Sequence, residues 1–125
     1  MTWVAIACGG ALGAVARHAV NHVVHVHALS TRIPFGTMAA NLSGCLAIGV
    51  LAGALAAGRI ALPFYWREFV FVGLLGGFTT FSTFGLDTLL LARTHSTGLA
   101  VLNAALHFAG GLGAVWLGYR LGHGA

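Results

Sequence analysis

The chain has 125 residues, of which 58% are hydrophobic and only 6% are charged, and its formal net charge at pH 7 is +4. A typical soluble domain has roughly 25% charged residues, so six basic and two acidic side chains are too few to cover the surface of a soluble protein. The positive charge does not indicate a nucleic-acid partner either, because the six arginines are scattered along the chain instead of clustered.

Four apolar segments are long enough to cross a bilayer, which takes about 20 residues. They are expected at about residues 3–25, 35–57, 67–91 and 98–121, joined by the short connections LSTRIP, GRIALPFYW and ARTHST. We therefore predict an all-α integral membrane protein, a single domain of residues 1–125 with four transmembrane helices. The first segment lacks a basic leading region and an evident cleavage site, so we expect a membrane span instead of a signal peptide.

The arginines leave the orientation in the membrane undecided. With the N-terminus inside, three arginines fall on the inner side and two on the outer side: Arg59, Arg67 and Arg120 against Arg32 and Arg93. Inner loops normally carry a clear excess of positive charge. The near balance indicates either weak orientation or a chain that inserts both ways.

The end of the first span carries a row of histidines. His18, His22 and His25 follow i, i+4, i+7 spacing on one helical face. Such a row can bind a metal or sense pH, or it can simply be the water-exposed end of a membrane helix. Arg17 begins the same region and could draw anions towards a vestibule.

The second span contains one amide, Asn41, with Thr37 and Gly44 on the same helical face. A lone asparagine in lipid is costly unless it faces protein or water. Asn41 therefore either makes an interhelical hydrogen bond or lines a polar passage.

The third span contains the decamer GGFTTFSTFG, residues 76–85. Two adjacent glycines weaken a helix by about 1 kcal/mol each, and the hydroxyls compete for backbone partners. These residues predict a break near the bilayer midplane, where irregular backbone survives only inside protein or beside a cavity. The freed carbonyl oxygens could hold Na⁺, or the break could be a kink without an ion.

Phe81 and Phe84 in the same decamer are three residues apart, so on a helix they share a face. Aromatic rings are positive at their edges, and such edges could meet an anion, although phenylalanines in spans usually just pack. Ser82 and Thr83 could likewise donate hydrogen bonds to an anion or to a neighbouring carbonyl.

The fourth span supplies another polar row, Asn103 and His107, four residues apart. Glycines at four-residue spacing also occur on every span, in the pairs Gly9 and Gly13, Gly49 and Gly53, Gly73 and Gly77, and Gly118 and Gly122. Small faces let membrane helices approach closely. Packing within one chain explains some of them, and their presence on all four spans favours an oligomer.

Acidic residues are missing from the middle of every span. Glu68 begins the third span and Asp87 lies towards its other end. A proton-coupled exporter of cationic drugs needs an intramembrane carboxylate, so this class is disfavoured, although Asp87 keeps it open. Neither a catalytic triad spacing nor a GxSxG elbow is present, so we do not expect an enzyme.

Three stretches resemble a known family, the small bacterial fluoride channels called Fluc or CrcB. They are GGALGAVARH in the first span, FGTMAANLSGC in the second and GLLGGFTTFSTFG in the third. The similarity extends over the whole chain, and GGxTTFSTF is highly specific. The resemblance implies a multi-pass protein of the bacterial inner membrane that exports fluoride passively and so relieves fluoride toxicity.

The resemblance also implies an antiparallel, dual-topology homodimer with two fluoride pores and a central structural Na⁺. The carbonyls of Gly76 and Thr79 would hold the Na⁺. The pore residues would be Phe81, Phe84, Asn41, Ser82, Thr83, Asn103 and His107. Arg17 would be the vestibule arginine.

The chain departs from the family pattern in the fourth span. Family members usually carry a tyrosine where Asn103 stands and a serine where His107 stands. Both positions stay polar, but a histidine would bring pH dependence to a pore that is pH-insensitive in the family. Two other functions remain open: a drug exporter that depends on Asp87, and a non-conducting subunit that needs a different protein partner.

Overall fold

The computed structural model describes residues 1–27, 32–94 and 96–124, and within these ranges the chain is helical and has no strand. The helices are α1 (Thr2–His27), α2 (Phe35–Ala56), α3 (Phe64–Arg67), η1 (Glu68–Leu75), α4 (Gly76–Phe78), α5 (Phe81–Thr94) and α6 (Thr97–His123). Residues 29–31 of the first predicted connection and His95 of the last lie outside the described residues.

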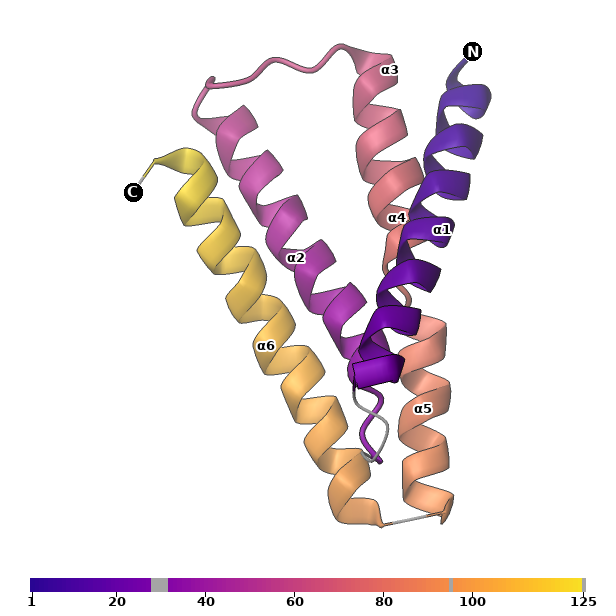
Figure 1. Ribbon diagram of the computed structural model, residues 1–125. Helices are drawn as coiled ribbons and strands as arrows, with labels where there is room; N and C mark the ends of the chain where they lie inside the picture. The colour runs from indigo at the N-terminus through magenta and orange to yellow at the C-terminus, as the bar shows by residue number, and fades with distance from the viewer. Residues whose placement is uncertain (28–31, 95, 125) are drawn as a thin grey trace.

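Four crossings are long and apolar enough to span a membrane: Thr2–His27, Phe35–Ala56, Phe64–Thr94 and Thr97–His123. The prediction of four all-helical spans is confirmed. The third crossing is a composite of α3, η1, α4 and α5, in which η1 is a π-helical stretch. Figure 1 shows the crossings alternating in direction, so that both chain termini lie at the same end of the molecule.

The third crossing is longer than predicted at both ends, running from residue 64 to residue 94. Pro63 precedes its first turn, where proline costs no backbone hydrogen bond. The aromatic residues 64–66, predicted to belong to the connection, form the first turn of the helix. The last helix begins where the Ser96 hydroxyl accepts a hydrogen bond from the Leu99 N–H at 3.1 Å.

One pair of crossings is joined by what we call the first glycine seam, formed by the residues Gly9, Gly13, Gly73 and Gly77. It brings α1 against η1 and α4. A Cβ atom at Gly9 would overlap the carbonyl oxygen of Phe69, and one at Gly13 would overlap that of Leu74. Backbone therefore packs directly on backbone along this contact.

The second glycine seam joins α2 to α6, the most extensive helix contact of the chain, and consists of Gly49, Gly53, Gly118 and Gly122. A Cβ at Gly118 would overlap the carbonyl oxygen of Leu46, and α2 and α6 run side by side in Figure 1. All four glycine pairs are thus used inside one chain. Their spacing, which we expected to favour an oligomer, reports intrachain packing instead.

The interior of the chain is small. Between 11% and 28% of the most apolar stretch of each crossing is buried, and large side chains such as Phe81, Leu112 and Trp116 are exposed. Most of the apolar surface therefore faces outward, as expected for a protein whose solvent is lipid.

Candidate functional site

The third crossing changes conformation at Thr79 and Thr80, which we call the α4–α5 junction. Helix α4 ends at Phe78, Thr79 is extended with φ −88° and ψ 157°, and α5 begins at Phe81. The N–H and the hydroxyl of Thr79 both donate to the carbonyl oxygen of Leu75, at 3.0 Å each. The hydroxyl thus helps to close the end of α4.

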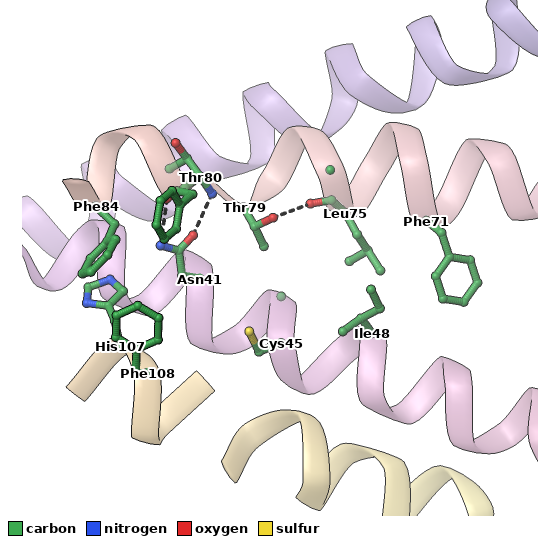
Figure 2. Close-up of a pocket in the computed structure, with 13 residues that line it drawn as sticks. Asn41, Cys45, Ile48, Phe71, Leu75, Thr79, Thr80, Phe84, His107 and Phe108 are labelled. Atoms are coloured by element: carbon green, nitrogen blue, oxygen red, sulfur yellow. Dashed lines mark hydrogen bonds between the residues drawn. The ribbon is translucent and has the colours of Figure 1, made fainter. Parts of the chain in front are cut away.

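The side-chain amide of Asn41 holds the other residue of the junction. Its Nδ2 donates to the Thr80 carbonyl oxygen at 3.0 Å, and its Oδ1 accepts from the Thr80 N–H at 2.7 Å. Figure 2 shows this pairing across the space between α2 and the third crossing. Asn41 therefore makes the interhelical hydrogen bonds that its position in a span required, and it replaces backbone partners that a continuous helix would supply.

The whole polar face predicted around Asn41 meets the third crossing. One turn earlier, the Thr37 hydroxyl donates to Oδ2 of Asp87 at 2.8 Å. One turn later, a Cβ at Gly44 would overlap the side-chain methyl of Thr79. The spacing of these three positions therefore sets the register of α2 against the junction.

The hydroxyl of Thr80 organises the start of α5. It accepts from the Thr83 N–H at 3.2 Å, donates to the Thr83 hydroxyl at 3.0 Å and lies 3.2 Å from the Ser82 hydroxyl. Thr80 is buried, whereas Ser82 is exposed and Thr83 is half-buried. Thr80, which we did not predict as a site residue, therefore contacts both Ser82 and Thr83, the two residues of the predicted hydroxyl track.

The hydrogen bonds that side chains make at the junction leave two backbone carbonyl oxygens without the N–H donor that a continuous helix would give them. In a continuous α-helix, the Gly76 oxygen would accept from the Thr80 N–H, and the Thr79 oxygen from the Thr83 N–H. Both N–H groups donate to side chains instead, to Asn41 and to the Thr80 hydroxyl. Gly76 and Thr79 are the two residues whose carbonyls were predicted to hold a cation.

A pocket of about 340 Å³ lies beside the junction. Five helical elements contribute to its lining, which consists of Asn41, Gly44, Cys45, Ile48, Phe71, Leu75, Gly76, Thr79, Thr80, Phe81, Phe84, His107 and Phe108. Figure 2 shows most of these side chains around the space between α2 and the third crossing. The pocket brings together six predicted site residues: Asn41, Gly76, Thr79, Phe81, Phe84 and His107.

The two predicted pore phenylalanines are neighbours with opposite surroundings. Their ring centroids are 5.4 Å apart, but Phe81 is 75% exposed and Phe84 only 7%. The Phe84 ring lies 4.5 Å from the imidazole of His107 and meets the Phe108 ring edge-on at 5.8 Å. The shared face predicted from their spacing therefore carries one ring packed in the bundle and one pointing out of it.

Asn103 supports this cluster from behind. It is fully buried, and its Nδ2 donates to the Thr88 hydroxyl at 2.8 Å, which in turn donates to the Phe84 carbonyl oxygen at 2.7 Å. Asn103 does not line the pocket. Its observed contacts position the turn of α5 that carries Phe84. Thr88 and Phe108 also belong to this cluster. Neither was predicted from the sequence, because neither belongs to a polar row.

A second pocket, of about 440 Å³, lies at the end of the molecule where α1 finishes and α2 begins. Its lining includes the predicted histidine row and several polar or charged residues, namely His18, His22, His25, Asn21, Arg32, Thr37 and Asp87. The described residues contain no group of three histidine, cysteine or acidic side chains placed to hold a metal. Arg17 is half-buried on α1 and belongs to the lining of neither pocket.

Comparison with known proteins gives concordant matches over most of the chain. Residues 4–119 match the family model described as CrcB-like protein, Camphor Resistance (CrcB). A protein from Nitrobacter hamburgensis named fluoride-specific ion channel FluC 2 is 49% identical over 105 residues, which is 83% of this chain and 82% of that protein. Proteins named fluoride-specific ion channel FluC from Methylobacillus flagellatus and Acidobacterium capsulatum are 41% identical over 116 residues and 42% identical over 123 residues. They cover 93% and 98% of this chain, and 90% and 97% of their own lengths.

Proposed function

Because this chain belongs to the CrcB family of multi-pass bacterial membrane proteins, we propose that it is a passive, fluoride-selective channel. In this proposal it lets fluoride leave the cytoplasm and so relieves fluoride toxicity. The relatives named above are ion channels, which are not enzymes.

The observation that carries this proposal is the composition of the pocket beside the α4–α5 junction. It combines an amide, threonine hydroxyls and phenylalanine rings, and no acidic side chain is among the described residues that line it. A small anion that loses its water needs hydrogen-bond donors and positive ring edges in return. This lining offers ring edges and the second N–H of the Asn41 amide, because the hydroxyls of Thr79 and Thr80 already donate to Leu75 and Thr83. It contains no carboxylate to repel the anion or to couple its movement to protons.

The membrane potential is a sufficient driving force for export. Fluoride enters a cell as neutral hydrofluoric acid and is trapped as the anion in a less acidic cytoplasm. An inside-negative potential then contributes about 2.3 kcal/mol per charge per 100 mV towards its exit. A selective passive path is therefore enough, which fits a chain without acidic residues in the middle of its spans.

The working unit in this proposal is an antiparallel homodimer with two pores. Support comes from the nearly balanced arginines and from Phe81, which is 75% exposed on the side of the chain that opens onto the pocket. A second copy against this face would cover the ring and close the pocket into a passage. Two oppositely inserted copies would create two equivalent passages.

The same interface would hold the structural Na⁺. Thr79 is the midpoint of the crossing Phe64–Thr94, which supports a helix break at the bilayer midplane. The carbonyl oxygens of Gly76 and Thr79 have lost their helical donors to side chains and are hard ligands of the kind that suit Na⁺. A cation there would supply positive charge that balances these carbonyl dipoles and ties the two copies together.

The test is fluoride efflux from liposomes that contain only the purified chain. Valinomycin starts electrogenic efflux from potassium fluoride-loaded vesicles, and a fluoride electrode records it, with chloride-loaded vesicles as the control. Rapid fluoride loss without a proton gradient is expected. Loss of chloride at a similar rate would contradict selectivity, and no loss of either ion would favour a subunit that needs another partner.

Asp87→Asn separates the channel from a proton-coupled exporter in the same assay. The carboxylate accepts a hydrogen bond from Thr37 and lies in the other pocket. The asparagine side chain keeps an acceptor oxygen, so fluoride efflux should stay within about twofold, a change of about 0.4 kcal/mol. Loss of all transport in this variant would instead favour an exporter built on Asp87.

A further inference from the structure

The last turns of α6 carry a basic and aromatic cluster that the proposed channel function does not use. A pocket of about 380 Å³ lies there, and its lining consists of Tyr119, Arg120, His123 and Gly124. The side chains of Tyr119, Arg120 and His123 are all exposed, so a molecule in the pocket can reach them. The Arg120 guanidinium also lies over the Trp116 ring, 5.3 Å from its centroid.

Arg59, in the connection after α2, brings a second guanidinium to the edge of this pocket. Gly58, with φ 68°, turns the chain at the end of α2, and the Arg59 N–H donates to the Ala54 carbonyl oxygen at 2.9 Å. The Arg59 guanidinium then lies so close to Gly124 that a Cβ atom there would overlap it. Arginines from two different crossings therefore meet at one end of the second glycine seam.

Close packing of backbone holds this end of α6 in place. A Cβ at Gly53 would overlap the Tyr119 carbonyl oxygen and would lie 2.8 Å from the His123 backbone nitrogen. The side chains of Tyr119 and His123 stack on each other, with ring centroids 5.8 Å apart. The hydrogen-bond donors of the pocket are therefore carried by a turn whose position is fixed by α2.

The pocket stays positive when the helix dipoles are counted. Helices α2 and α6 both end here, and each C-terminus carries about −0.5 charge, so two arginines leave an excess of about one positive charge. The two acidic side chains of the sequence lie elsewhere. Asp87 lines the second pocket, and Glu68 begins η1, which α6 does not contact within the described residues. An anion would therefore meet no competing carboxylate side chain.

The face of α6 that leads from this pocket towards the bilayer centre is apolar. Leu112, Trp116 and Arg120 follow one another at four-residue spacing, and the first two are 73% and 62% exposed. Tryptophan and tyrosine are typical of the level of the lipid headgroups. The arrangement therefore suits a ligand with a negative head at the pocket and hydrocarbon chains along the helix.

We propose that the pocket at the end of α6 binds the phosphate of an anionic phospholipid. Arg120 and Arg59 are its charged ligands, since guanidinium groups form paired hydrogen bonds with phosphate oxygens. Basic pockets between membrane helices are typical of headgroup sites. The site is separate from the proposed fluoride passage, so either proposal can fail without the other.

The experiment titrates the full chain, purified in a neutral detergent, with dioleoyl phosphatidylglycerol and counts bound lipid by native mass spectrometry. Dioleoyl phosphatidylcholine has the same acyl chains but no net charge, and inorganic phosphate has the charge without the chains. Phosphatidylglycerol should bind at least about tenfold more tightly than either, because each arginine contributes about fivefold. Equal binding of phosphatidylcholine, or equal binding of inorganic phosphate, overturns the inference.

Substitutions locate the site. Arg120→Gln and Arg59→Gln should each weaken phosphatidylglycerol binding about fivefold. Arg120→Lys keeps the charge but loses the planar fork, so its loss should be smaller. The matched control is Arg67→Gln, because Arg67 is exposed on α3 at the same end of the molecule (Figure 1), and α3 does not contact α6 within the described ranges. An equal loss in Arg67→Gln would show diffuse attraction to surface charge and contradicts a site.

A second measurement uses only the wild type and does not depend on the folding of a variant. Phosphatidylglycerol with a photoreactive diazirine in its headgroup is crosslinked to the full chain in liposomes, and the labelled peptides are identified by mass spectrometry. Labels should concentrate at Arg59 and on residues 116–124. Even labelling of the ends of all four crossings overturns the inference. Neither measurement involves fluoride, so the channel function is tested separately.

Discussion

The glycine seams and the pocket beside the α4–α5 junction solve opposite problems in the same membrane domain. Along the seams, side chains are absent and backbone packs on backbone, so that Gly118 leaves no room for a single added carbon. At the junction, backbone hydrogen bonds are absent and side chains replace them, with Asn41 paired to Thr80. The first seam fixes α4 on one side of the junction, and the second seam fixes α2, which carries the Asn41 amide that bonds Thr80. The irregular backbone therefore lies against helices whose positions are set by close packing elsewhere.

The largest effect is expected from filling a seam. Gly118→Ala places a Cβ against the carbonyl oxygen of Leu46, and overpacking against backbone costs about 3 kcal/mol or more because backbone cannot rotate away. After heating in detergent, most of the monodisperse peak of this variant in size-exclusion chromatography should be lost.

Gly113→Ala is the matched control for that experiment. It lies on the same helix, is exposed, and a Cβ there would meet nothing within 4 Å. Alanine should leave stability unchanged or raise it slightly, by up to about 1 kcal/mol, because it favours helix. Equal stability of the two variants would show that the seam does not hold α2 and α6 together.

The next effect is expected at the junction itself. Asn41→Ala removes two hydrogen bonds and leaves the N–H and the carbonyl of buried Thr80 without partners, which costs about 2 kcal/mol. Thermal stability and fluoride efflux should both fall. Ser43→Ala is the control, because the exposed hydroxyl of Ser43 bonds only carbonyls of its own helix. Efflux that falls equally in both variants would contradict a special role of Asn41.

Sequence reasoning succeeded where local composition decides the outcome. The four crossings follow from apolar length alone. The face of Thr37, Asn41 and Gly44 was also visible as a helical spacing, and the structure assigns its interhelical partners.

Sequence reasoning was less informative where the outcome depends on a distant partner. Four-residue glycine spacing identifies a close-packed face but not what packs on it, so intrachain seams looked like evidence for an oligomer. Thr80 was one hydroxyl among several in the decamer, and its role depends on Asn41, 39 residues away. Phe108 carries no polar signal at all, and only the packing of α5 on α6 brings it to the Phe84 ring.

The smallest effect in free energy, and the most informative about the pore, concerns the two phenylalanines. Phe81→Ile and Phe84→Ile each remove a positive ring edge from the pocket lining, and each should lower fluoride efflux at least about tenfold, which corresponds to about 1.4 kcal/mol. Their stabilities should differ, because Phe84 is packed against His107 and Phe108 whereas Phe81 is 75% exposed. Phe81→Ile therefore tests the ring edge with little structural cost to the single chain.

Phe64→Ile is the control: it replaces an exposed ring at the start of α3 and should conduct like the wild type. If Phe81→Ile also conducts like the wild type without a change in oligomeric state, an outward-facing ring contributes nothing to anion passage, and the pore must be confined to the side of the bundle that carries Phe84.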